Sequence, residues 1–100
     1  MTQPTTKEVL IAARALIEKP ENWCSHGWGH DNQRCGVRAV AIINGRALYP
    51  DCDEAPEIVG SIAENHLHDS VGEYFGNFND THTHAEVLAA FDKAIAECAQ

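Results

Sequence analysis

The fold class is decided near the C-terminal end of the chain, where residues 83–98 read THAEVLAAFDKAIAEC. This stretch opens with a capping box, because the Thr83 hydroxyl can accept a hydrogen bond from the Glu86 amide while the Glu86 carboxylate reaches back to the Thr83 amide. Apolar side chains then recur at steps of three and four residues, and they form one stripe of Val87, Leu88, Phe91, Ala94, Ile95 and Cys98. The pattern predicts an amphipathic helix over residues 83–98.

The N-terminal segment repeats this arrangement. Thr5 and Glu8 have the spacing of a second capping box, and apolar residues at helical spacing follow them. Pro20 then ends the apolar pattern, since proline cannot continue a helix. These signals predict a helix over residues 5–19.

A third helix is expected in the second half of the chain. Asp53 is a suitable N-cap, and Pro56 would lie in the first turn, where its missing N–H costs no hydrogen bond. A stripe of apolar residues that includes His66 follows at helical spacing. We therefore predict a helix over residues 54–68.

Residues 35–49 allow two interpretations. Residues 37–43 are rich in β-branched side chains, and Asn44-Gly45 is a strong signal for a two-residue hairpin turn. Alternatively, the apolar residues share one face of a helix, and Gly45 is the residue that follows its C-terminus. Propensity alone favours the hairpin.

Three short stretches in the C-terminal third resemble a known family; they are Phe78-Asn79-Asp80, Ala85-Glu86-Val87-Leu88 and Phe91-Asp92-Lys93-Ala94. The family is the domain-of-unknown-function family 6197 of small bacterial and phage proteins. Its members carry an aromatic-Asn-Asp step before a helix, a Trp after the first helix and a Cys that opens a helix of small residues. Trp23 and Cys35 stand at the corresponding places, whereas Phe78 replaces the usual Trp and Arg38 the usual Gly. The resemblance implies a compact, mainly helical domain and no particular activity.

The resemblance makes a helix the preferred interpretation of residues 35–45. A chain of 100 residues forms a single domain, residues 1–100, since separate cores usually need about 100 residues or more each. We expect an all-α domain of about four helices, near residues 5–19, 35–45, 54–68 and 83–98. The alternative is an α+β domain with three helices and a hairpin at residues 37–49.

The composition excludes several classes of function. Fifteen acidic residues against seven Lys and Arg give a formal net charge of −8, which disfavours direct binding to nucleic acid. No stretch approaches the roughly 18 apolar residues of a membrane span, and the N-terminus has no signal-peptide pattern, so a cytoplasmic protein is expected. The four cysteines are then expected to be reduced thiols.

Four candidate zinc ligands, Cys24, His26, His30 and Cys35, lie within twelve residues. Thiolate and imidazole are the ligands that zinc prefers, and four of them would close a tetrahedral structural site. Their spacing lacks the Cys-x₂-Cys element of zinc fingers and ribbons, so the alternative is a loop with solvated histidines. We expect no cofactor, with zinc as the alternative.

An enzyme is not expected. Cys35 at a helix start, with His30 five residues before it, could form a cysteine–histidine pair for nucleophilic catalysis. The sequence shows no nucleophile motif, phosphate-binding loop, carboxylate pair or dinucleotide fingerprint. Cys35 and Cys98 are better interpreted as small buried apolar residues.

Three residues are candidate contacts with a partner: Asn79 and Asp80 in the predicted loop that begins at Gly76, and Trp28 in a Gly-rich loop. The structural interpretation is that Phe78 packs inward while Asn79 and Asp80 tie their loop to the last helix.

The sequence thus favours a small acidic accessory protein of bacterial or phage origin that acts by binding another protein. Inhibition of a host or defence complex is a natural role, because an acidic surface can occupy a groove that binds nucleic acid. The alternative is a small zinc-binding structural module.

Overall fold

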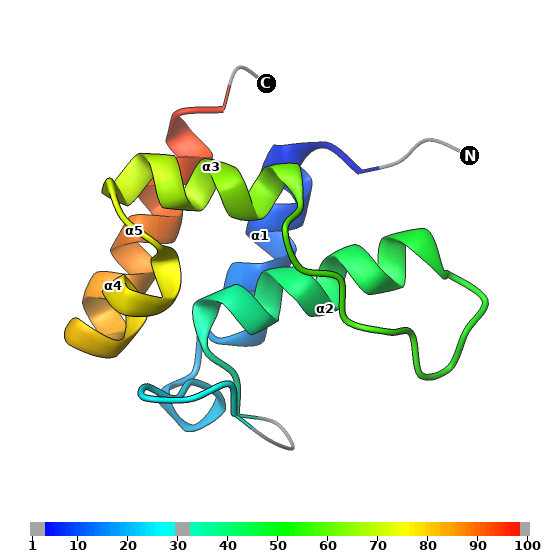
Figure 1. The fold of residues 1–100 in the computed structure, drawn as a ribbon, viewed down its shortest axis with the longest axis horizontal. Helices are drawn as coiled ribbons and strands as arrows, with labels where there is room; N and C mark the ends of the chain where they lie inside the picture. Colours follow the sequence, from blue (N-terminus) through cyan, green and yellow to red (C-terminus); the bar gives the residue numbers. More distant parts are fainter. Residues whose placement is uncertain (1–3, 30–32, 99–100) are drawn as a thin grey trace.

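The computed structural model describes residues 4–29 and 33–98, which contain five α-helices and one turn of 3₁₀-helix (Figure 1). The elements are α1 (Thr6–Leu16), η1 (Pro20–Asn22), α2 (Gly36–Leu48), α3 (Ile62–Val71), α4 (Phe75–Thr81) and α5 (His84–Ala96). Within these residues the only β pairing is an isolated parallel bridge between Trp23 and Arg34. The expected mainly helical fold is confirmed, with one helix more than the four predicted.

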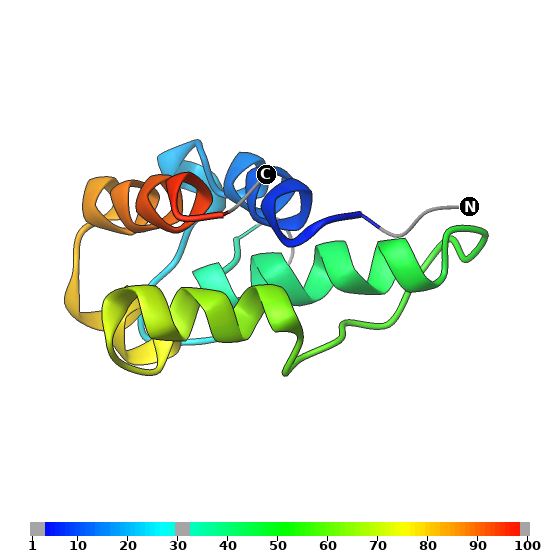
Figure 2. The ribbon, with the colours of Figure 1, turned by 90° about the horizontal axis from the view of Figure 1, so that it is seen from above.

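The helices form two layers. Figure 2 shows α1 and α5 side by side in one layer, with α2, α3 and α4 in the other. The molecule measures 36 × 33 × 21 Å, and its shortest dimension corresponds to two helices of about 10 Å each. The largest fully buried side chains are Phe75, Phe91, Leu10, Ile17, Leu67, Val37, Val40, Val87 and Asn79. The core therefore lies between the layers, and Asn79 is its one polar member in this set.

Both predicted capping boxes are confirmed. The Thr5 amide donates to Glu8 Oε1 at 2.8 Å and the Glu8 amide donates to Thr5 Oγ1 at 3.1 Å. The corresponding distances for Thr83 and Glu86 are 2.8 and 3.2 Å. Helices α1 and α5 therefore begin where the local sequence signals place them.

The hairpin alternative at residues 37–49 is wrong, because this segment is helix α2. Cys35 is its N-cap, and the Cys35 sulfur accepts a hydrogen bond from the Arg38 amide at 3.4 Å. Gly45 lies inside the helix rather than after it, and a Cβ there would collide with the Pro56 carbonyl oxygen. The small buried residues of α2 let another segment approach it closely, and this tertiary contact outweighs local β propensity.

The predicted helix at residues 54–68 begins too early. Helix α3 starts after Ser61, whose hydroxyl accepts from the Glu64 amide at 3.1 Å, and it extends to Val71. Residues 53–60 instead run beside α2, where the Ile58 amide donates to the Ala41 carbonyl at 3.0 Å. Gly60, with φ of +77°, breaks any helix at this point.

Helix α4 was predicted as a loop, because Gly76, Asn77, Asn79 and Asp80 are poor helix formers. Burial of Phe75 holds it in place. The Phe75 ring is fully buried and meets Phe91 edge to face, with the ring centroids 5.5 Å apart. Tertiary packing thus forms a helix that local propensity does not favour.

None of the helices in the described part of the chain has the length and apolar character needed to cross a membrane.

Candidate functional site

Asn79 connects three parts of the chain through one fully buried amide side chain. Its Oδ1 accepts from Trp23 Nε1 at 2.8 Å and from the Gly36 amide at 3.0 Å. Its Nδ2 donates to the Cys24 carbonyl at 2.9 Å. These bonds fix α4 against the first turn of α2 and against the segment that leaves η1.

The next residue, Asp80, holds the loop that follows. Its Oδ1 accepts from the His26 amide at 2.7 Å. His26 has φ of +59°, in the left-handed region that non-glycine residues seldom adopt, and this bond stabilises the turn. Asn79 and Asp80 therefore tie α4 to residues 23–26 and to the start of α2, and the prediction that they tie a loop to the last helix is wrong.

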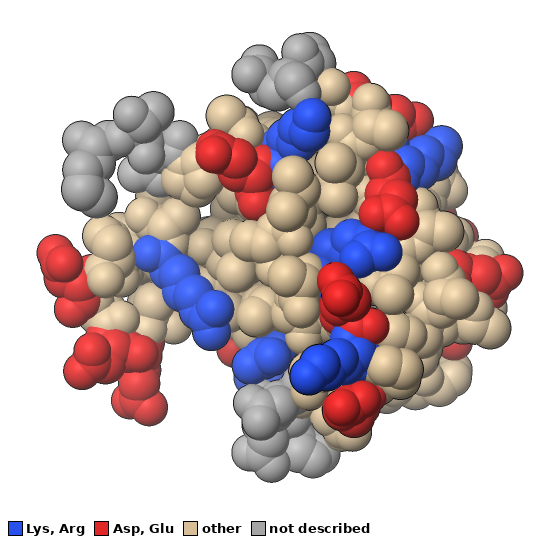
Figure 3. Space-filling model, turned by 180° about the vertical axis from the view of Figure 1, so that it is seen from behind, with Lys and Arg blue, Asp and Glu red and all other residues tan. Residues whose placement is uncertain are grey.

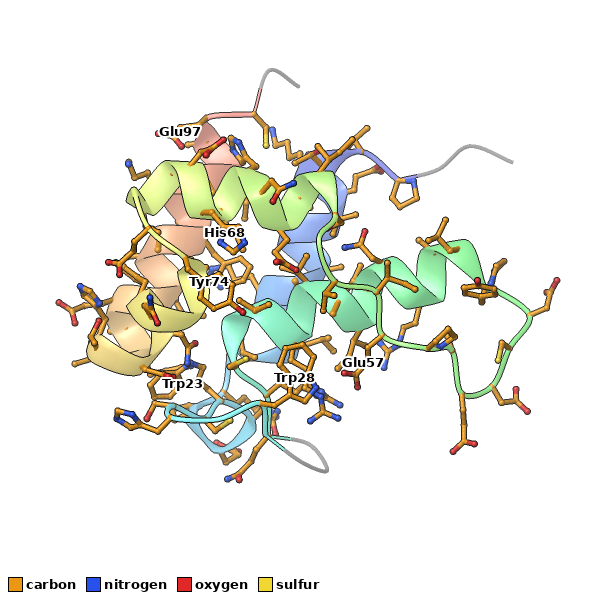
Figure 4. All side chains as sticks on the ribbon, viewed as in Figure 1. Trp23, Trp28, Glu57, His68, Tyr74 and Glu97 are labelled. Atoms are coloured by element: carbon orange, nitrogen blue, oxygen red, sulfur yellow. The ribbon has the colours of Figure 1, made fainter. Side chains whose placement is uncertain are left out.

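A recess of about 210 Å³ lies where these segments meet; its lining is Gly27, Trp28, Cys35, Val37, Tyr74, Gly76, Asn77 and Asp80. Trp28 and Tyr74 are the large aromatic residues of this lining, and they are 41% and 52% exposed. Figure 4 shows them on separate segments, with Glu57 beside Trp28 and His68 beside Tyr74. We call the surface formed by Trp28, Tyr74 and Asp80 the aromatic face.

The Trp28 side of the recess is held by a chain of polar contacts. Trp28 Nε1 donates to Glu57 Oε1 at 2.9 Å. The other oxygen of Glu57 forms an ion pair with Arg38 Nε at 3.1 Å. The indole is therefore oriented by a carboxylate whose own charge is balanced.

The Tyr74 side is held by His68, whose ring centroid is 5.0 Å from that of Tyr74. His68 Nδ1 accepts from the Phe75 amide at 2.9 Å, so the proton of the neutral ring is on Nε2. Nε2 then donates to the buried Glu64 carboxylate at 3.0 Å. Both ring nitrogens are occupied, and His68 is a positioning residue rather than an available base.

The electrostatics of the recess favour neutral thiols. Burial raises the pKa of the Cys35 thiol, although the hydrogen bond from the Arg38 amide opposes this effect. Burial also raises the pKa of Cys24. A nucleophilic cysteine needs a lowered pKa, so nothing here supports the cysteine–histidine hydrolase considered from the sequence.

The proposed zinc ligands are only partly within the described residues. Cys24 and Cys35 directly follow the two residues of the Trp23–Arg34 bridge, and the His26 amide is bound to Asp80. His30 lies outside the described residues. Across residues 4–29 and 33–98, no group of three or more His, Cys, Asp or Glu side chains is arranged to hold a metal ion.

The acidic segment around Asp53 is partly balanced by arginines. Asp53, Glu54 and Glu57 share a hollow of about 220 Å³ with Arg34, Arg38 and Arg46. Figure 3 shows acidic and basic side chains interleaved over the back of the molecule. The net negative charge is therefore not gathered into one acidic patch on that face.

The sequence singles out Trp28, Asn79 and Asp80 as candidate contacts with a partner, without predicting that they meet. The structure brings Trp28 and Asp80 to one recess, whereas Asn79 is fully buried. Sequence reasoning missed Tyr74. Tyr74 directly precedes α4. Because the sequence does not predict α4, it gives no indication of where Tyr74 lies.

No curated protein and no solved structure matches the chain. The model of a family of unknown function, DUF6197, matches residues 1–97, and the chain belongs to this family.

Proposed function

We propose that the protein acts by binding another protein through its aromatic face. The observation that carries the proposal is that Trp28 and Tyr74, both about half exposed, meet at one recess. Trp and Tyr are enriched among the residues that contribute most to protein–protein affinity. They supply a large apolar contact area and retain a polar atom for hydrogen bonding.

The site is also held in place before any partner binds. Glu57 orients Trp28, His68 supports Tyr74, and the bond from the His26 amide fixes Asp80. A preorganised surface loses less side-chain entropy on association, so more of the contact energy contributes to affinity.

The net charge of −8 favours a partner with a basic surface. A groove that binds nucleic acid is one such surface, and an acidic protein that covered this groove would inhibit the nucleic-acid-binding protein. This is the accessory, inhibitory role that the sequence suggests for a bacterial or phage protein.

Affinity purification with quantitative mass spectrometry tests the proposal. Wild-type protein is compared with the double variant Trp28→Ala/Tyr74→Ala in lysate of the native host or source cell. We expect a partner of net positive charge that is recovered by the wild type and lost with the double variant.

The matched control is Leu48→Ala/Tyr49→Ala, which removes two residues of similar exposure (52% and 49%) at the end of α2. It should retain the partner. The proposal is overturned if the wild type recovers no partner, or if the control loses the partner and the aromatic-face variant keeps it.

A further inference from the structure

We propose that the recess receives one cationic side chain, a lysine or arginine of the partner, between Trp28 and Tyr74 and next to Asp80. This inference rests on the proposed function and specifies the chemistry that the aromatic face recognises.

The size of the recess suits one side chain. Its volume of about 210 Å³ is below the roughly 300–1,000 Å³ of pockets that bind small-molecule ligands. It corresponds to about seven water molecules at roughly 30 Å³ each. An extended side chain can fill such a space, whereas a nucleotide-sized ligand cannot.

The walls suit a cation. Two aromatic rings line the recess, and a cation within about 6 Å of a ring centroid is attracted to the face of the ring. Gly76 allows the Tyr74 ring to occupy its position at the recess, because a Cβ at Gly76 would collide with that ring. The aliphatic part of a lysine or arginine would pack on the rings while its charge lies near the rim.

The charges around the recess are negative. Asp80 lines it, and its Oδ1 accepts a hydrogen bond from the His26 amide, a neutral group. Glu64 is bonded to His68, whose ring contacts that of Tyr74. Arg38, which lies beside Glu57, is paired with that carboxylate.

The Tyr74 hydroxyl reports the same environment. Burial raises its pKa, and the negative charges of the Glu64 and Asp80 carboxylates raise it further. Burial disfavours any charge here, but the two carboxylates disfavour only a negative one, so they would favour a bound cation and repel an anion.

The test uses the ¹⁵N-labelled chain of residues 1–100 and a short peptide with neutral ends that carries one lysine. The matched probe is the same peptide with acetyl-lysine, which has the same stem without the charge. The indole N–H signal of Trp28 is assigned by its loss in Trp28→Phe. We expect a saturable shift of this signal with the lysine peptide and affinity at least about tenfold weaker for the acetylated one.

Asp80→Asn removes the charge and keeps an oxygen that can accept from the His26 amide. It should weaken binding of the lysine peptide about fivefold, the scale of one exposed charge pair. Asp51→Asn removes the same charge from an exposed loop after α2 and should leave the affinity unchanged. An unchanged melting temperature in both variants confirms that the fold is intact.

The inference is overturned if the two peptides bind equally, if the lysine peptide does not bind, or if Asp51→Asn weakens binding as much as Asp80→Asn. These outcomes are distinct from failure of the proposed function. The double variant Trp28→Ala/Tyr74→Ala could lose the partner while the lysine peptide fails to bind the wild type. That pair of results would support the proposed function and reject the binding of a cationic side chain in the recess.

Discussion

At the scale of single residues, Asn79 does most to shape the site. Sequence reasoning selected Asn79 and Asp80 through their resemblance to a family motif, and it assigned both a structural role. It connected them to the wrong segment, because their partners, three backbone groups and the Trp23 indole, lie more than 40 residues away in the chain. Nothing local encodes such a contact, which depends on how α4 packs against residues 23–26 and the start of α2.

Asn79→Ala tests this role. The substitution leaves the Trp23 indole N–H, the Gly36 amide and the Cys24 carbonyl without their partner in a buried place. Each unpaired buried group costs about 1–3 kcal/mol, so the loss of three partners should lower the free energy of unfolding by at least about 3 kcal/mol. Urea denaturation followed by circular dichroism measures it.

Asn77→Ala is the control, since it makes the same change at an exposed position of the same helix. It should cost less than about 1 kcal/mol, the usual range for a surface site. Equal losses in the two variants would show that the Asn79 bonds contribute no special stability.

At the scale of elements, the sequence predicts best where the signal is local. The two capping boxes set the starts of α1 and α5 through contacts three residues apart, and both are confirmed. Helix α2 was predicted only with the help of the family resemblance, because its β-branched residues and Asn44-Gly45 favour a hairpin. The predicted start of α3 was wrong. Gly60 interrupts the helical backbone and Ser61 caps the helix, and together they determine its start more strongly than Asp53 and Pro56.

Gly45→Ala should destabilise the protein although alanine is the better helix former. A Cβ at this position collides with the Pro56 carbonyl, which is backbone and cannot move aside without shifting residues 49–61. Overpacking of this kind costs about 1–3 kcal/mol. Thermal unfolding of the variant measures the loss.

The neighbouring exposed position provides the control. Arg46→Ala should be more stable than Arg46→Gly by about 1 kcal/mol, the ordinary helix preference. If Gly45→Ala also raises the melting temperature, residues 49–61 do not pack against α2 as described.

The capping box of α5 gives a pH dependence. Hydrogen bonds from Thr83 lower the pKa of the Glu86 carboxyl, the backbone amide contributing most. The ionised form therefore favours folding, and this contribution is complete above the ordinary carboxyl pKa and is lost as the pH falls through the lowered one. Glu86→Gln should have a lower melting temperature than the wild type at pH 7.

At pH 2.5 the melting temperatures of Glu86→Gln and wild type should converge. Glu54→Gln, at an exposed carboxylate outside the helices, should show no such difference at either pH. A difference for Glu86→Gln that persists unchanged at pH 2.5 would mean that the charge of Glu86 plays no part.

At the scale of the whole molecule, the overall sequence pattern predicted the helical fold class but not the recess at the aromatic face. Length and hydrophobic periodicity indicate one helical domain, and the described residues show a mainly helical fold in two layers. The recess needs residues from three separate stretches of the chain, 27–28, 35–37 and 74–80. The last of these contains α4, a helix that no local sequence signal predicts. The net charge favours a basic partner, but it does not indicate where on the surface of the protein that partner binds.

The net charge also predicts how solubility changes with pH. Protonation of all six histidines would raise the formal charge from −8 by six units. Repulsion between molecules then weakens, and solubility should fall as the pH approaches the sequence pI of about 5.0. Precipitation by polyethylene glycol at pH 8 and pH 5 measures the change, and equal solubility would contradict it.

The central claim is that a partner protein covers the aromatic face. Hydroxyl-radical footprinting of the free protein and of its complex with the recovered partner tests this claim most directly. Trp28, Tyr74 and Tyr49 are exposed to similar extents (41%, 52% and 49%), so each reports on its own surface. The account predicts that the partner protects Trp28 and Tyr74 from oxidation and leaves Tyr49 unprotected; protection of Tyr49 with continued oxidation of Trp28 and Tyr74 would contradict it.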